Sequence, residues 1–412
     1  MRALSTLLGL PQHRFASIHV VGTNGKSSVT RMVAALLEAH GVSAGACVSP
    51  HAARWAERTL VHGEEIGEAE FATAVERTAQ AAEAVNRGLP EGEAVTQFEF
   101  ATAASFVALA DARVAAAVIE AGLGGRLDAT NTIPSKVTVL TSVGLDHTQW
   151  LGEREEEIAA EKLAVLRDHS ILVLGRVSPA VAALAERTAA ERGARLIVAP
   201  EDPTSTRPAS RPYLGLDAGR VGLRAAGGFQ RRNFAVACAA AEAFLGGLDR
   251  GCVADVAATV EIPGRLERIG NEPPTYLDAA HNPDGARALA EAIPGLAAGH
   301  PVVAVLAVLA DKDARAMIEV LKPVLTQAVC TELPSASADG PQSGQIGHFA
   351  AHRRGFGADE LAGVCGAVGV VAEAVVDFAA AVARGRELAL EIGGVLLVTG
   401  SHYALAPARA AL

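Results

Sequence analysis

The sequence predicts an α/β protein built on a mostly parallel sheet with helices on both faces. Short apolar runs rich in Val and Ile alternate with Ala-rich stretches of helical periodicity. The apolar runs are continuous rather than alternating, which is typical of parallel strands that are buried on both sides. The strand candidates are 17–21, 44–48, 114–120, 136–143, 170–174 and 195–199. The helix candidates are 26–39, 68–87, 97–111, 153–167 and 178–192. Ligands of such sheets bind at the carboxyl ends of the strands, so we expect functional groups there.

The chain is long enough for two domains. It has 412 residues, of which 50% are hydrophobic, and this is ample material for more than one core. The turn-rich segment IPGRLERIGNEPP at 262–274 interrupts the α/β pattern, which then resumes. We therefore predict a first domain at 1–267 and a smaller α/β domain at 268–412. Two polar segments, at 200–212 and 335–360, are predicted to be loops.

Composition excludes several classes of function. The net charge is −10 without a long basic run, so binding to nucleic acid or to an anionic membrane surface is not expected. No signal-peptide pattern opens the chain and no span of 18 apolar residues is free of charge, although 360–376 comes close. The cysteines are scattered and lack C-x-x-C spacing, which indicates reduced thiols rather than a zinc site or disulfides. These observations predict a cytoplasmic protein.

The stretch VGTNGKSS at 21–28 has the order of parts of a phosphate-binding loop. A strand leads into a Gly-bounded turn, which is followed by one lysine and two hydroxyl residues that open a helix. Backbone N–H groups and a helix N-terminus attract phosphate, and Lys26 adds a positive charge. The strict G-x-x-x-x-G-K-[ST] pattern fails because Val20 stands five positions before Gly25. A tight turn whose Ser27 or Ser28 merely caps the helix is the structural alternative.

A second block, IEAGLGGRLDATN at 119–131, places Glu120 at the end of a predicted strand. Its glycines allow the backbone to approach a ligand closely, and Arg126 and Asp128 add charge. The third glycine is misplaced for a dinucleotide-binding fingerprint, so a Rossmann cofactor is disfavoured. A structural role for Glu120 at the strand end stays open.

Further strand ends carry polar residues. TSVGLDHTQWLG at 141–152 places His147 after a strand, and LDAAHNPDGA at 277–286 does the same for Asp278. Carboxylates suit magnesium, whereas an imidazole ligand to magnesium is unusual. The shorter signals SPH (49–51), FQRRN (229–233) and PGR (263–265) are weak alone and are also explained as turns or caps.

Taken together, these motifs resemble folylpolyglutamate synthase/dihydrofolate synthase, a family of the Mur ligase superfamily of ATP-dependent amide-forming enzymes. The resemblance rests on VGTNGKSS, SPH, TQFEFAT, IEAGLGGRLDATN, TSVGLDHTQWLG, FQRRN, PGRLE and LDAAHNPDGA, and runs from residue 1 to about 290. It implies a Mur-ligase-like P-loop ATPase domain followed by a Rossmann-like C-terminal domain. GLGGRLDATN and LDHTQWLG are specific to the folate branch.

The resemblance also implies site residues. ATP would be bound by Gly22, Thr23, Asn24, Gly25, Lys26, Ser27, Ser28, Asn233, Arg265, Asp278 and His281. The first of two Mg²⁺ ions would be bound by Ser49 and Glu120, and the second by His147 and a carbamylated Lys162. The pterin would contact Thr96, Gln97, Phe98, Glu99, Leu127, Asp128 and Ala129. Catalysis would depend on Lys26, Glu120, His147 and Lys162.

The reaction implied is activation of a pterin carboxylate by ATP as an acyl phosphate, which the amine of L-glutamate then attacks. The substrate would be dihydropteroate, a reduced folate or both, and the protein would be a monomer. Two alternatives stay open: a Mur-type ligase for another carboxylate, and an inactive nucleotide-dependent binding protein.

The sequence departs from the family pattern at several positions. Ser27 replaces the glycine that usually follows the loop lysine, and EKLAV stands for EKAGI around Lys162. MRALSTLLGLPQ resembles the middle of the family's first helical region, so we expect a truncated start. The 335–360 segment stands where the family usually has a tidier strand-to-helix connection.

Overall fold

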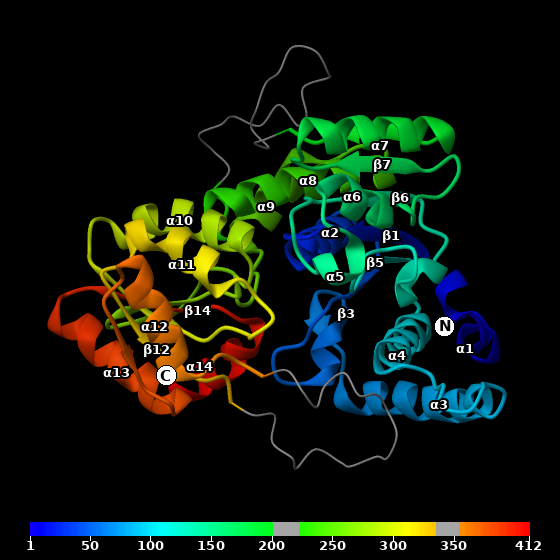
Figure 1. The fold of residues 1–412 in the computed structure, drawn as a ribbon. Coiled ribbons are helices and arrows are strands. Elements are labelled where there is room, and N and C mark those ends of the chain that lie inside the picture. Colours follow the sequence, from blue (N-terminus) through cyan, green and yellow to red (C-terminus); the bar gives the residue numbers. More distant parts are fainter. Residues whose placement is uncertain (201–221, 335–353) are drawn as a thin grey trace. The chain divides into compact units, whose positions relative to one another are not determined.

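The structure is a computed structural model that describes residues 1–200, 222–334 and 354–412 (Figure 1). It divides into two compact units, the first formed by 1–224 with 230–260 and the second by 225–229 with 261–412. The predicted loop at 200–212 lies outside the described residues except for its first position, as does most of the 335–360 segment. The predicted domain limits, 1–267 and 268–412, stay a prediction.

The first unit is built on an eight-stranded sheet. Its strand order is β4-β3-β2-β5-β1-β6-β7-β8. The strands are β1 Ala16–Val21, β2 Ala44–Cys47, β3 Thr59–Val61, β4 Glu64–Glu65, β5 Ala116–Glu120, β6 Val137–Leu140, β7 Ile171–Leu174 and β8 Arg195–Val198. All neighbouring pairs are parallel except β2–β3 and β3–β4. The predicted mostly parallel sheet is thus confirmed, with an antiparallel edge that the sequence did not indicate.

Helices cover this sheet and supply its core. They are α1 Arg2–Leu7, α2 Lys26–Ala39, α3 Glu68–Asn86, α4 Gln97–Asp111, α5 Thr148–Leu151, α6 Glu155–Leu163, α7 Pro179–Glu191, α8 Gly228–Leu245 and α9 Arg250–Thr259. Three 3₁₀ turns add to them: η1 Pro11–His13, η2 Trp55–Arg58 and η3 Ala129–Thr132. Apolar side chains of α6 and α7 pack on β6 and β7, and those of α4 pack on β5. This burial of the strands explains their continuously apolar sequences.

Two predicted elements extend well beyond the carboxyl ends of the observed ones. The strand predicted at 136–143 ends at Leu140. After it, the Thr141 hydroxyl donates to the Asn24 carbonyl and the Ser142 hydroxyl accepts from the Asn24 N–H, so both side chains bind the loop after β1. The helix predicted at 153–167 ends at Leu163. The bounds predicted for α2 and α4 are confirmed.

The second unit contains a six-stranded sheet in the order β13-β12-β11-β14-β10-β9. Its strands are β9 Glu267–Asn271, β10 Pro274–Leu277, β11 Val302–Leu306, β12 Gln327–Cys330, β13 Ala372–Ala374 and β14 Val395–Thr399. Its helices are α10 Pro283–Ala297, α11 Ala314–Leu321, α12 Ala358–Val368, α13 Phe378–Glu391 and α14 Leu405–Ala411, with the 3₁₀ turns η4 Lys322–Val324 and η5 His402–Ala404. Among these strands the neighbouring pairs are parallel except β9–β10. A mostly parallel sheet is what we expect for a Rossmann-like α/β unit.

The structure also describes the longest apolar helices and the cysteines. Of the helices in the described part of the chain, none is long and apolar enough to cross a membrane. The five cysteines are free thiols, and all except Cys252 are buried.

Candidate active site

The phosphate-loop candidate joins the carboxyl end of β1 to the first turn of α2. Gly22 and Gly25 adopt positive φ angles of 154° and 84°. A Cβ atom at Gly25 would lie 2.6 Å from the Asn233 Oδ1 atom, and one at Gly22 would collide with the Thr141 hydroxyl. Both positions therefore require glycine, for conformation and for space.

The loop is held by the end of β6, a contact that the sequence analysis missed. The backbone N–H of Thr23 donates to the Ser142 carbonyl at 2.8 Å, and that of Asn24 donates to the Ser142 hydroxyl at 3.0 Å. The Thr141 hydroxyl donates to the Asn24 carbonyl at 2.7 Å. The signal in the sequence was the pair of hydroxyl residues at a strand end in TSVGLDH.

Two lysines meet at the first carbonyl of the loop. The Lys26 Nζ donates to the Gly22 and Thr23 carbonyls at 3.1 and 3.2 Å, and the Lys162 Nζ donates to the Gly22 carbonyl at 3.0 Å. Lys162 is only 4% exposed. This burial, together with the nearby Lys26 charge, lowers the pKa of Lys162 to about 7. Its amine is therefore neutral in a large fraction of molecules near neutral pH.

A buried carboxylate faces the start of α2. Glu120, the last residue of β5, is 2% exposed. Its Oε1 accepts a hydrogen bond from the Ser27 hydroxyl at 2.9 Å, and its Oε2 accepts one from the Ser49 N–H at 2.9 Å. Ser27, the departure from the family's glycine, therefore contacts the carboxylate predicted to hold a metal ion.

His147 and its neighbour Asp146 follow β6. His147 has a left-handed backbone with φ of 52°, and its N–H donates to the Asp146 carboxylate at 2.9 Å. The His147 Nε2 lies 3.8 Å from the same carboxylate oxygen. The Asp146 charge also acts to raise the pKa of Lys162, against the effect of burial. Asp146 is thus a charged member of this site that the sequence analysis quoted but did not assign.

The donor set beside the loop fits magnesium. Mg²⁺ in nucleotide sites is bound through one or two carboxylates together with substrate phosphates and water. The buried Glu120 carboxylate with the adjacent Ser27 and Ser49 matches that chemistry. No group of three or more His, Cys, Asp or Glu side chains suited to a metal ion occurs among the residues that the structure describes.

Two residues predicted to contact the pterin have structural partners. The Thr96 hydroxyl accepts from the Glu99 N–H at 3.2 Å, and the Glu99 carboxylate accepts from the Thr96 N–H at 3.0 Å, which forms a capping box at the start of α4. Glu99 also pairs with the Met1 amine. Between them, Gln97 and Phe98 are half-buried, and the Phe98 ring occupies the space beside Gly122.

The glycine-rich loop is organised by Asp128. Its carboxylate accepts hydrogen bonds from the Leu123 N–H at 2.8 Å, from the Thr130 N–H at 2.9 Å and from the Thr130 hydroxyl. Burial raises the pKa of Asp128, and these hydrogen bonds oppose that rise. Leu127 is 94% exposed, whereas Ala129 is buried. Of the three predicted contact residues here, only Leu127 offers a large exposed side chain.

The nucleotide-binding residues predicted near the C-terminal domain form a separate cluster in the second unit. The Asp278 carboxylate accepts from the Leu266 and Ala280 N–H groups at 2.9 and 2.8 Å. Burial raises the pKa of Asp278, whereas Arg265 and His281 act to lower it. These three side chains are therefore neighbours. Asn233 belongs to the first unit, where it lies beside Gly25.

Comparison with known proteins adds independent findings. The Mur ligase middle domain matches residues 20–202, and the Mur ligase glutamate ligase domain matches residues 264–402. A dihydrofolate synthase/folylpolyglutamate synthase from Mycobacterium tuberculosis is 35% identical over 371 residues, covering 82% of this chain and 74% of the relative.

Solved structures agree with these matches. That of the Mycobacterium tuberculosis folylpolyglutamate synthase complexed with ADP and AMPPCP is similar with a TM-score of 0.85 and 30% identity, covering 99% of this chain and 93% of that one. That of a bifunctional folylpolyglutamate synthase/dihydrofolate synthase from Yersinia pestis, complexed with AMPPNP and a Mn ion, has a TM-score of 0.79 and 28% identity, covering 99% and 91%. The predicted Mur ligase fold is thereby confirmed.

Proposed function

Because the chain belongs to the folylpolyglutamate synthase/dihydrofolate synthase family of Mur ligases, we propose that it joins L-glutamate to a pterin carboxylate with hydrolysis of ATP. The substrate is dihydropteroate, a reduced folate that already carries glutamate, or both. The observation that carries this proposal is the convergence of Lys26, Lys162 and the buried Glu120 at the phosphate loop.

The first chemical step brings two anions together, since a carboxylate attacks the γ-phosphate to form an acyl phosphate and ADP. Lys26 and the backbone N–H groups at the start of α2 stabilise the negative charge on the transferring phosphoryl group. Lys26 contacts only backbone carbonyls of the turn itself, and its ammonium can exchange them for phosphate oxygens. The amine of glutamate then attacks the acyl carbon, which yields the amide and releases phosphate.

Magnesium completes the site. When bound, Mg²⁺ neutralises phosphate charge as a Lewis acid. We propose a first ion at Ser49 and Glu120 and a second at His147 and Lys162. The family's solved structures include one with a nucleotide analogue and Mn, and the use of two sites by this chain is part of the proposal.

Lys162 becomes a metal ligand only as a carbamate. Its neutral amine attacks the carbon of CO₂, a C–N bond forms as one C=O π bond breaks, and one proton leaves the nitrogen, so the neutral amine becomes an anionic oxygen donor. A pKa of about 7 supports this, because the nucleophilic form is populated near neutral pH.

The residues predicted to contact the pterin fall into two groups according to their contacts in the structure. We propose that Gln97, Phe98, Leu127 and Ala129 line the pterin site, and that Thr96, Glu99 and Asp128 hold the segments that carry them. ATP contacts by Asn233, Arg265, Asp278 and His281, the domain limits 1–267 and 268–412, a monomeric state and a cytoplasmic location remain proposals of the family resemblance.

The decisive experiment measures ADP release by the purified protein with Mg-ATP. We expect release to depend on L-glutamate together with dihydropteroate or tetrahydrofolate. Stimulation by one pterin alone would identify a monofunctional enzyme. Absence of stimulation by either pterin would contradict the folate assignment, and nucleotide binding without turnover would support the inactive binding protein.

A further inference from the structure

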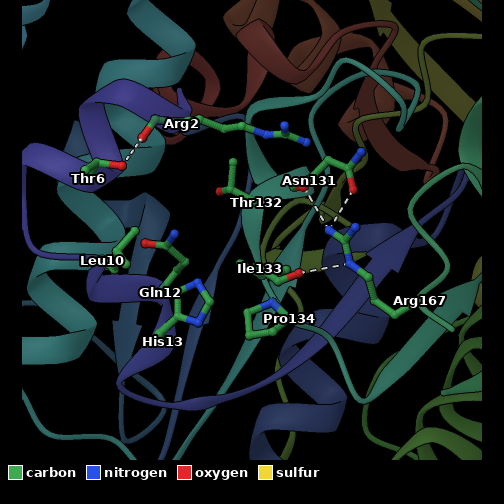
Figure 2. A pocket seen from close by; sticks show the side chains of 10 residues that line it. All are labelled: Arg2, Thr6, Leu10, Gln12, His13, Asn131, Thr132, Ile133, Pro134 and Arg167. Atoms are coloured by element: carbon green, nitrogen blue, oxygen red, sulfur yellow. Dashed lines mark hydrogen bonds between the residues drawn. The ribbon is translucent and has the colours of Figure 1, made fainter. Parts of the chain in front are cut away.

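A cavity lies at the amino-terminal edge of the first sheet, away from the strand ends that carry the phosphate loop. Its wall comes from α1, from η1 before β1, from the segment before β6, and from Arg167 before β7 (Figure 2). The cavity has a volume of about 430 Å³, which is in the range of small-molecule sites. None of its lining residues belongs to the ATP, metal or pterin sets described above.

The charge of the lining is one-sided. Its charged side chains are Arg2 and Arg167, and none of its described lining residues is an aspartate or glutamate. The Arg2 guanidinium has no hydrogen-bond or ion-pair partner within the described part of the chain. In Figure 2 its side chain extends from α1 toward Asn131. A cation without a counter-charge beside a cavity favours an anionic occupant.

Arg167 is held in a fixed orientation. Its Nε donates to the Ile133 carbonyl at 3.1 Å, and its Nη2 donates to the Asn131 carbonyl and side-chain oxygen, both at 2.8 Å. Its Nη1 has no partner among the described residues. Burial lowers the pKa of Arg167, and the Arg192 and Arg2 charges act in the same direction. A pre-oriented guanidinium with unused N–H groups is suited to bind phosphate or carboxylate.

An unpartnered buried amide points to a ligand independently of charge. Gln12 is 3% exposed and lines the cavity, yet its Oε1 has no hydrogen-bond partner within the described residues. Leaving such a group unpaired costs free energy that a bound molecule would recover. Beside it, Leu10, Ile133 and Pro134 give the cavity an apolar side (Figure 2).

We propose that this cavity binds a small organic anion through a phosphate or carboxylate group. Arg2 and the Nη1 group of Arg167 contact the anionic group, the Gln12 Oε1 accepts a hydrogen bond from a hydroxyl group of the same molecule, and Leu10 with Ile133 contacts the apolar part. The site is distinct from the phosphate loop, and the proposal does not depend on the ligase activity.

Isothermal titration calorimetry of the full chain tests this inference, with glycerol 3-phosphate as the organic phosphate and citrate as the carboxylate. Each probe is titrated with and without saturating AMPPNP and Mg²⁺, which occupy the phosphate loop. We expect at least one probe to bind with 1:1 stoichiometry in both conditions, and the stronger probe identifies the chemistry of the ligand.

Variants locate the binding. Arg2→Gln is expected to weaken affinity by about tenfold or more, because it removes one charged contact. Gln12→Leu is expected to weaken it less. Arg187→Gln, which removes the same charge from an exposed position of α7, is the matched control and should bind as the wild type does.

Three results would overturn the proposal: no binding of either probe at millimolar concentration, binding that AMPPNP abolishes, or equal binding by Arg2→Gln and the wild type. Arg2→Gln is preferred to Arg167→Gln because Arg167 also ties down backbone carbonyls, and its loss can unfold the loop.

Discussion

Two glycine-rich loops lie at the carboxyl edge of the first sheet, and two carboxylates beside them, the buried Glu120 and the half-buried Asp128, have different kinds of partner. The loop at 22–25 and the loop at 121–128 both need glycine where a Cβ atom would collide with a neighbour. At Gly25 that neighbour is Asn233, and at Gly125 it is the Glu161 carbonyl, each 2.6 Å from the hypothetical Cβ. Close packing is therefore common to both loops and does not identify the reactive one.

The difference is in what the carboxylates bind. Asp128 accepts hydrogen bonds from its own segment of the chain, at Leu123 within the loop and at Thr130 directly after it. Glu120 instead accepts from Ser27 and Ser49, which belong to two other segments of the chain. A buried carboxylate that joins distant segments beside a phosphate loop is placed to hold a ligand, whereas one that closes its own loop stabilises structure.

The largest effect is expected for Glu120→Gln. If Glu120 holds magnesium, loss of its charge should lower kcat/KM by about a thousandfold or more, because transition-state charge is no longer neutralised. Steady-state ADP release measures this, and urea unfolding should show little change. Glu186→Gln, on an exposed position of α7, serves as control. Substantial activity in Glu120→Gln would remove the distinction between the two loops.

Lys162→Ala should come next, with activity reduced by about a hundredfold or more through loss of a metal ligand. Short carboxylates added to this variant should restore part of the activity, since they can replace the carbamate oxygen. The exposed Lys136→Ala is the matched control. Full activity without added carboxylate would exclude the proposed role of Lys162.

The carbamate itself should depend on pH. Because the pKa of Lys162 is lowered to about 7, its amine becomes protonated and unreactive as the pH falls through that value. Protein equilibrated with ¹³C-bicarbonate should show a carbamate resonance by NMR at pH 8 that weakens below about pH 7. The resonance should be absent in Lys162→Ala, and its persistence there would assign it to another amine.

Asp128→Asn should affect stability more than chemistry. An amide cannot accept all three hydrogen bonds and would oppose one N–H donor with another, so the free energy of unfolding should fall by about 1–3 kcal/mol. Urea denaturation compares this variant with Asp255→Asn, an exposed position in the same unit. A loss of kcat as large as that of Glu120→Gln, at unchanged stability, would show that Asp128 acts in catalysis.

The smallest effect is expected for Ser27→Gly, which introduces the family's usual residue. It removes one hydroxyl donor from Glu120 but leaves the Ser49 N–H in place. We expect kcat/KM to change by less than about tenfold, because one of two hydrogen bonds to the carboxylate is kept. A larger loss would make the Ser27 hydroxyl part of the metal site in this chain.

Local sequence patterns determined much of the fold. Helical periodicity predicted α2 and α4 with their correct bounds, because it reflects the local requirement that one face of a helix be buried. Continuous apolar runs predicted the parallel strands, and strand-end polar residues then indicated the edge where the site lies. The motifs from VGTNGKSS to LDAAHNPDGA, taken together, were sufficient to indicate the family.

Only the tertiary structure decided which side chains and backbone groups contact one another. The hold of Thr141 and Ser142 on the phosphate loop joins residues more than a hundred positions apart, and so does the contact of Lys162 with Gly22. The sequence also did not predict that Asp128 binds backbone groups of its own segment, or that a cavity lined by Arg2 and Arg167 lies at the opposite edge of the sheet. Both features depend on packing, because packing determines the hydrogen-bond partners and the counter-charges of a side chain. Sequence periodicity specifies which face of an element is buried, but the chain must fold before a buried carboxylate acquires the neighbour that gives it a function.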